Sequence, residues 1–217
     1  MGLQEEIIEV ARRLEERYGR LEWRSHGGPL DLLIETILSQ NTNDANRDRA
    51  YAGLKARFPT YEALAAAPVE ELAETLRPGG LHRQKARRIK DILQRIAAEQ
   101  GSYTLNYLEP LGTAEALAEL LRFGGVGKKT AGVVLLFSLG KPYFPVDTHI
   151  ARIAGRLGWL KGGDLPHEKL NFLIPDRLKY QLHLQLIRHG REICRARRPR
   201  CAECPLSDPC PSAFQAD

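Results

Sequence analysis

The chain has 217 residues, a mass of 24.4 kDa and a formal net charge of +5. This length is enough to bury a hydrophobic core without disulfides, which excludes a small disulfide-bonded scaffold. The hydrophobic fraction of 43% and the charged fraction of 27% exclude an intrinsically disordered chain. The longest mostly apolar run, residues 131–139, is shorter than the roughly 18 residues of a membrane span, and the acidic N-terminus is unlike a signal peptide. We therefore expect a cytoplasmic protein without a membrane partner.

Helical periodicity dominates the sequence, and no segment shows the sustained alternation of a half-buried strand. The first predicted helix carries an apolar stripe from Leu3 to Tyr18, and Pro29 begins a second helix that is apolar nearly all round to Leu38. Thr113 and Asp147 are the predicted N-caps of two later helices. Further helices are predicted at 44–57, 61–66, 68–76, 83–98, 113–122, 128–138, 148–157 and 176–191. These elements predict an all-α fold.

All four cysteines lie within seventeen residues near the C-terminus. They have the spacing C-x6-C-x2-C-x5-C and are Cys194, Cys201, Cys204 and Cys210. Four thiolates this close can hold one metal centre, and the spacing favours an iron–sulfur cluster over zinc, because it contains a single C-x2-C pair and no nearby histidine knuckle. The expected cytoplasmic location disfavours disulfides. Spacing alone leaves both kinds of metal centre open.

The loop between the first two cysteines is rich in arginine, with Arg197 and Arg198 at its middle. A loop clamped by a metal centre would hold its guanidinium groups in fixed positions, which suits contact with phosphate. The alternative is an ordinary solvated basic surface.

A glycine-rich turn separates the predicted helices 113–122 and 128–138. It does not fit a Walker A loop, because Lys129 follows Gly127-Lys128 and no strand precedes the turn; the missing strand also excludes a dinucleotide-binding fingerprint. A Gly-x-Gly turn that begins a helix presents free N–H groups and the positive end of the helix dipole, which together can bind phosphate. An ordinary helix–helix corner is the alternative, and the two lysines behind the turn favour phosphate binding.

Several motifs occur in a fixed order along the chain: GVGKKTA at 125–131, VDTH at 146–149, HGR at 189–191 and the cysteine pattern. Together they resemble the endonuclease III family, which are helix-hairpin-helix DNA glycosylases with a [4Fe-4S] cluster. The resemblance extends from Pro29 to Cys210. It implies a six-helix domain over 22–141, a cluster domain formed by 1–21 and 142–217, and an active site between them.

The resemblance implies that Lys129 is the nucleophile and that Asp147 is its partner. Cleavage of an N-glycosidic bond needs a neutral amine that attacks the sugar C1′ and a carboxylate that accepts a proton or stabilises positive charge on the sugar. The helix dipole and the adjacent Lys128 both disfavour the ammonium form of Lys129. Taken singly, Lys129 is also compatible with an ordinary surface lysine, and Asp147 with a simple helix cap.

An enzyme that acts on a base in duplex DNA takes the base out of the stack and leaves a gap. The family fills this gap from two loops, which correspond here to Asn41, or the adjacent Gln40, and to Leu81. Contacts with the DNA backbone are expected from Gly125, Val126, Gly127, Arg197 and Arg198. The chain departs from the family pattern at two places. Many relatives carry glutamine at the position of Asn41, and relatives commonly carry Leu-Pro at the positions of Phe123 and Gly124.

We therefore expect a monomeric enzyme of base-excision repair that excises oxidised pyrimidines from duplex DNA and cleaves the 3′ side of the abasic site through a Schiff base on Lys129. In a prokaryote it would be associated with the nucleoid. The alternatives are a monofunctional or mismatch-type glycosylase of the same fold, a non-catalytic module that binds duplex DNA, and a zinc-bearing basic scaffold.

Overall fold

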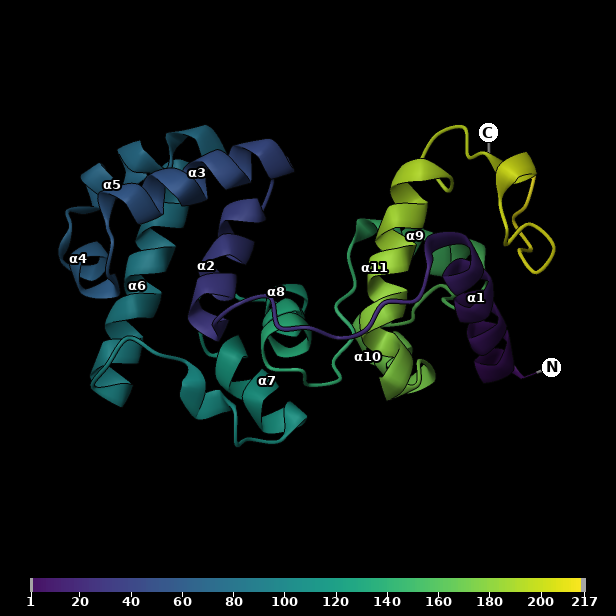
Figure 1. Cartoon of the computed structure of the whole chain (residues 1–217), viewed down its shortest axis with the longest axis horizontal. Helices are drawn as coiled ribbons and strands as arrows, with labels where there is room; N and C mark the ends of the chain where they lie inside the picture. The colour runs from purple at the N-terminus through teal and green to yellow at the C-terminus, as the bar shows by residue number, and fades with distance from the viewer. Residues whose placement is uncertain (1, 216–217) are drawn as a thin grey trace. The chain divides into compact units, whose positions relative to one another are not determined.

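The computed structural model describes residues 2–215, and the fold of this part is all-α, as predicted, without a strand among the described residues. The chain divides into two compact units. One comprises residues 25–139; the other combines the N-terminal segment up to Arg24 with the segment from Gly140 onwards. Figure 1 shows the chain coloured along its length, with both units visible. Within residues 2–215, no helix has the length and apolar character needed to cross a membrane.

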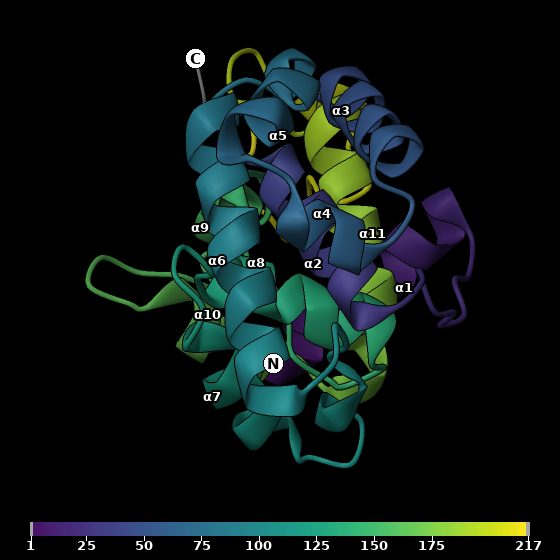
Figure 2. The ribbon, with the colours of Figure 1, turned by 90° about the vertical axis from the view of Figure 1, so that its left-hand side faces the viewer.

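The unit of residues 25–139 is built around one buried helix. This helix, α2 (Pro29–Ser39), contacts α3, α6 and α8, and its side chains Leu33, Ile37 and Leu38 are fully buried. Figure 1 shows α2 between α6 and α8, and Figure 2 shows α6 from the side that also carries α4 and α5. The other helices are α3 (Asp44–Arg57), α4 (Tyr61–Ala66), α5 (Val69–Thr75), α6 (His82–Gln100), α7 (Thr113–Leu121) and α8 (Lys128–Val133), with short 3-10 turns at Arg77–Gly79 and Asn106–Leu108. The loop that follows α2 and the loop that precedes α6 are therefore attached to helices that pack against each other.

The two ends of this unit are bonded to each other. The N–H of His26 donates to the carbonyl of Phe137 at 2.9 Å, and the Ser138 hydroxyl donates to the carbonyl of Gly27 at 2.6 Å. Phe137 and Ser138 belong to a π-helical segment, Val134–Ser138, that follows α8. The chain thus enters and leaves the unit at the same place.

In the second unit, α11 (Asp176–Glu192) packs against both α1 (Leu3–Tyr18) and α9 (Thr148–Arg156). Its core includes Ile7, Leu14, Ile150, Trp159 and Leu182. A shorter helix, α10 (Pro166–Leu173), contacts α1, and a 3-10 turn at Cys201–Glu203 lies within the cysteine-rich loop. Because α11 ends just before Cys194, its packing sets where that loop begins.

The crossing of α9 and α11 depends on the absence of a side chain at Gly190. A Cβ atom there would lie 2.8 Å from Nδ1 of His149, closer than side-chain contacts allow. The freed space also lets the Arg152 guanidinium donate to the Gly190 carbonyl at 3.0 Å. The VDTH and HGR motifs therefore meet at this crossing.

The predicted helices lie within two residues of the observed ones, with three differences. The predicted N-cap Thr113 is wrong: Gly112 is the N-cap, because the Glu115 side chain reaches back to accept from the Gly112 N–H at 2.9 Å. The predicted helix 128–138 is α-helical only to Val133 and continues as the π-helical segment. Helix α10 was not predicted, although Pro166 at its first position is a start signal.

Candidate active site and cysteine cluster

The glycine-rich turn between α7 and α8 forms a tight hairpin. The N–H of Val126 donates to the carbonyl of Phe123 at 3.1 Å, and both of these side chains are buried. Gly125 has a φ of +76°, and Gly127 is the N-cap of α8. Lys129 lies in the first turn of α8 and is exposed. The buried Val126 side chain thus anchors the hairpin, while Gly125, Gly127 and Lys129 are exposed.

An arginine from α6 packs directly on the hairpin. A Cβ atom at Gly125 would lie 2.0 Å from Nε of Arg88, so a side chain there would have to displace this guanidinium. Arg88 donates to Oε1 of Gln40 at 2.6 Å, and the Gln40 amide donates to the hydroxyl of Thr130 at 3.3 Å. This chain of contacts joins the end of α2, helix α6, the hairpin and the residue next to Lys129.

The two loops predicted to fill a DNA gap share an unusual backbone conformation. Asn41 has a φ of +52° and Leu81 a φ of +47°, values that non-glycine residues seldom adopt. Both side chains are exposed, Leu81 by half of its area. The neighbouring Gln40 is half-buried and engaged with Arg88, so Asn41 is the residue of the pair that faces solvent.

Asp147 begins α9 in the other unit and is the N-cap, as predicted. Its Oδ1 accepts from the N–H of Ile150 at 2.8 Å, and the side chain is half-buried. This bond fixes the carboxylate while leaving Oδ2 outside the cap. Lys129 belongs to the unit of residues 25–139 and Asp147 to the other, so each side chain is positioned by a different core.

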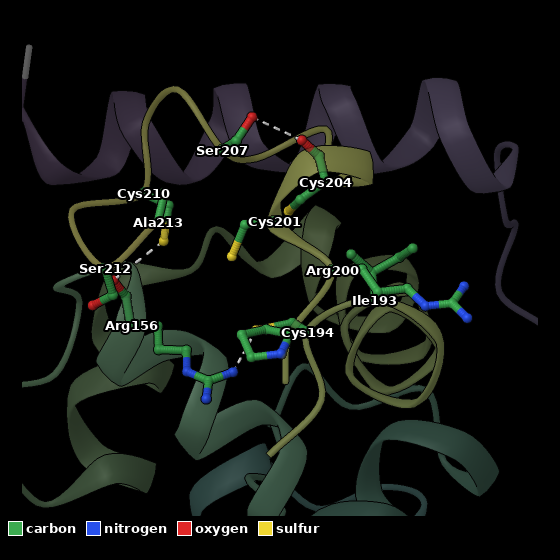
Figure 3. A pocket seen from close by; sticks show the side chains of 11 residues that line it. Arg156, Ile193, Cys194, Arg200, Cys201, Cys204, Ser207, Cys210, Ser212 and Ala213 are labelled. Atoms are coloured by element: carbon green, nitrogen blue, oxygen red, sulfur yellow. Dashed lines mark hydrogen bonds between the residues drawn. The ribbon is translucent and has the colours of Figure 1, made fainter. Parts of the chain in front are cut away.

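The four cysteines line one cavity, with about 330 Å³ of empty space that is partly open to solvent. Figure 3 shows their side chains around this space, together with Arg156 from α9. Arg156 donates to Sγ of Cys194 at 3.2 Å, and the N–H of Leu206 donates to Sγ of Cys204 at 3.4 Å. Within residues 2–215, no three His, Cys, Asp or Glu side chains are arranged as the ligands of a single metal ion. The cavity therefore gathers four soft donors in its lining.

Burial disfavours charge around this cavity. It raises the pKa of the Cys204 thiol to about 11 and also raises that of Cys210. Burial, together with the nearby Arg17, lowers the pKa of His189 to about 4; this ring lies 3.1 Å from the Tyr18 hydroxyl and 3.5 Å from Sγ of Cys204. Buried thiols become thiolates when a metal centre supplies positive charge, so these four donors fit such a group.

Helix α9 also holds the start of the arginine loop. The Arg156 guanidinium donates to the carbonyl of Arg195 at 2.7 Å and to that of Ala196 at 3.1 Å. The N–H of Arg200 donates to the carbonyl of Ile193 at 3.0 Å, which closes the loop at its base. Arg197 and Arg198 lie at its tip and are exposed.

The sequence matches the family model of the HhH-GPD superfamily of base excision DNA repair proteins over residues 34–173, a span that includes the hairpin and α9. The chain belongs to this superfamily. It is an endonuclease III-like DNA glycosylase of base-excision repair, and hence an enzyme.

Members of the superfamily resemble the chain over different shares of their length. Endonuclease III of Thermotoga maritima is 36% identical over 206 residues, which cover 94% of this chain and 92% of that protein. A putative DNA glycosylase of Arabidopsis thaliana is 44% identical over 168 residues; the match covers 76% of this chain and 57% of the longer plant protein.

Solved structures of the superfamily show the same fold. A trapped covalent intermediate of endonuclease III with DNA superposes with a TM-score of 0.83 at 30% identity, covering 99% of both chains. A thermostable thymine-DNA glycosylase superposes with a TM-score of 0.79 at 22% identity, which shows the shared fold alone.

Two residues that contact the candidate sites of this HhH-GPD protein were not predicted from the sequence. Arg88 lies in a run of basic residues on α6, and Arg156 ends α9; neither belongs to a recognisable motif. Their roles depend on contacts with distant segments, and no local pattern separates them from other helical arginines.

The contact between Gly125 and Arg88 predicts unequal effects for two neighbouring substitutions. Gly125→Ala forces a side chain into the left-handed region and against the guanidinium, so we expect it to lower the free energy of unfolding by about 1–3 kcal/mol. It should also weaken duplex DNA binding. Gly124→Ala meets no atom within 4 Å, and its effect should stay within about 0.5 kcal/mol. Urea unfolding and DNA titration measure both variants, and equal effects would contradict this account.

Proposed function

We propose that this chain is a bifunctional glycosylase and AP lyase that excises oxidised pyrimidines from duplex DNA. The observation that carries the proposal is Lys129, an exposed amine in the first turn of α8 directly behind the hairpin. It occupies the position of the nucleophilic lysine in the motif that resembles endonuclease III. The similarity to a trapped covalent endonuclease III–DNA intermediate supports this role.

In the proposed reaction, Nζ of Lys129 attacks C1′ of the damaged nucleotide. The N-glycosidic bond breaks, and the base leaves with the bonding electron pair and takes up a proton. The attacking nitrogen loses a proton, and the C1′–O4′ bond of the sugar then breaks as O4′ takes up a proton, which leaves a Schiff base between Lys129 and C1′. This Schiff base makes the C2′ proton acidic; its removal expels the 3′ phosphate and cleaves the strand. A monofunctional glycosylase would stop after base loss, so cleavage distinguishes the two activities.

We assign the partner carboxylate to Asp147. Its Oδ1 is held by the N–H of Ile150, which fixes the orientation of the group at the start of α9. The charge can then stabilise the positive sugar or accept the proton that the lysine loses. Asp147→Asn keeps an acceptor for the cap but removes this charge.

Duplex DNA is the proposed partner. Gly125 and Gly127 of the hairpin are exposed, and backbone N–H groups at the start of a helix such as α8 suit a phosphate. Asn41 and Leu81 are proposed to occupy the gap left by the flipped nucleotide. In this proposal the domain of residues 22–141 carries the nucleophile, and residues 1–21 with 142–217 carry Asp147 and the cysteines.

We further propose that Cys194, Cys201, Cys204 and Cys210 hold a [4Fe-4S] cluster. Four cysteine side chains that line one cavity support such a centre. When bound, the cluster would join the four thiolates covalently through iron and so fix the loop that carries Arg197 and Arg198. No reaction step is assigned to it.

Trapping with borohydride tests the nucleophile. A duplex with an abasic site or an oxidised thymine should form a covalent adduct with the protein, because borohydride reduces the Schiff base. We expect Lys129→Ala to lose the adduct and the exposed-lysine control Lys161→Ala to retain it. Tight binding without adduct or base loss would instead indicate a non-catalytic DNA-binding module.

Metal analysis of the purified protein tests the cluster. We expect a brown protein with about four iron atoms per chain and a visible absorbance that bleaches on reduction. Cys204→Ala should lower the iron content. A colourless protein that contains stoichiometric zinc would contradict the proposal.

The salt dependence of DNA binding tests the arginine loop. If Arg197 and Arg198 each neutralise one phosphate, replacing both by Ala should reduce the slope of log K against log salt by about 1.8, since each contact contributes roughly 0.9. The double control Arg12→Ala with Lys161→Ala loses the same charge at other exposed sites. An equal change in slope for both variants would contradict a specific phosphate role.

A further inference from the structure

A lysine of α6 is buried in the unit of residues 25–139. Lys85 is only 2% exposed, and its ammonium donates to the carbonyl of Leu38 at 2.7 Å and to that of Gly79 at 2.9 Å. Burial, with the like charge of Arg88, lowers its pKa. Placing an ammonium group here is costly, because these two acceptors are carbonyls rather than carboxylates.

The two acceptors lie at the bases of two different loops. Leu38 is in the last turn of α2, where carbonyls lack intrahelical partners and the helix dipole favours a cation. It precedes Asn41 by three residues. Gly79 ends the 3-10 turn Arg77–Gly79 and precedes Leu81 by two residues. One ammonium group therefore connects the bases of both loops.

Both loops need such support, because Asn41 and Leu81 hold left-handed conformations that persist only where the surroundings enforce them. Gly79 is also closely packed on its other side: a Cβ atom there would lie 3.2 Å from Cβ of Ala50 on α3. The Gly79 segment is thus held between α3 and the Lys85 ammonium.

We infer that Lys85 is a positioning residue that sets the separation of Asn41 and Leu81, and through them the filling of the gap in duplex DNA. This inference rests on the proposed function for the part that concerns DNA. A single-stranded abasic site has no stack to refill, so Lys85 matters for duplex substrates and not for the chemistry at Lys129.

The test compares strand cleavage at an abasic site in a duplex and in a single strand of the same sequence, under single-turnover conditions. Lys85→Met keeps the length of the unbranched apolar stem but removes the ammonium, and we expect it to lower the duplex-to-single-strand rate ratio by about 10-fold or more. The matched control is Lys179→Met. Lys179 is also buried, with its ammonium bonded to the carbonyl of Pro142 at 2.9 Å and paired with Asp176, but it belongs to the other unit. The duplex-to-single-strand rate ratio of Lys179→Met should equal that of the wild type.

A combined variant shows whether Lys85 acts through the two loops. Asn41→Ala with Leu81→Ala should lower the same ratio, and adding Lys85→Met should lower it no further, since coupled residues are not additive. A full additional loss, or an equal loss on single-stranded DNA, would overturn the inference.

Amide hydrogen exchange tests the positioning role without DNA. Lys85→Met should accelerate exchange in residues 38–42 and 79–82 together, whereas Lys179→Met should leave both unchanged. Unchanged exchange in either segment overturns the inference. If the wild-type protein cleaves neither substrate, the proposed function fails, and the exchange result alone decides the role of Lys85.

Discussion

In the unit of residues 25–139, the arrangement of the candidate site depends on the contacts of the Arg88 guanidinium. It lies over Gly125, which has a positive φ and no side chain, and it holds the Gln40 amide that reaches Thr130. Because a guanidinium is planar and has several fixed donors, it can pack against a backbone and bond sideways at the same time. The hairpin, the end of α2 and the helix that carries Lys129 are thus fixed relative to one another by one side chain.

Much of the fold could be predicted from the sequence because its helices have strong apolar periodicity and clear stop signals. The stripe from Leu3 to Tyr18 and the start at Pro29 are local patterns, and local physics decides them. The N-cap at Thr113 was mispredicted because a hydroxyl residue favours that position, while Glu115 caps the backbone of Gly112 from inside the helix. The π-helical segment after α8 has no sequence signature of this kind.

In the candidate site, too, local sequence patterns could be predicted and long-range contacts could not. The motifs located the hairpin, Asp147 and the four cysteines, whose gathering around one cavity matches the metal-centre interpretation. They could not reveal Arg88, Arg156 or Lys85, because each of these bonds to backbone or side-chain groups far away in the sequence. Nor could they separate Gln40 from Asn41, whose different exposures follow from the contact with Arg88. Long-range polar contacts to carbonyls leave no spacing pattern to find.

The bonds that join residues 26–27 to residues 137–138 bear on how the chain folds. The other unit packs α1 against α11, which are separated in the sequence by the whole inserted unit of residues 25–139, and the entropy cost of closing such a loop grows with its length. Once residues 25–139 have folded, the two points of entry and exit are already adjacent. The folded insertion then holds the two ends of the interrupted unit's sequence close together, and that unit can assemble almost as though its sequence were continuous.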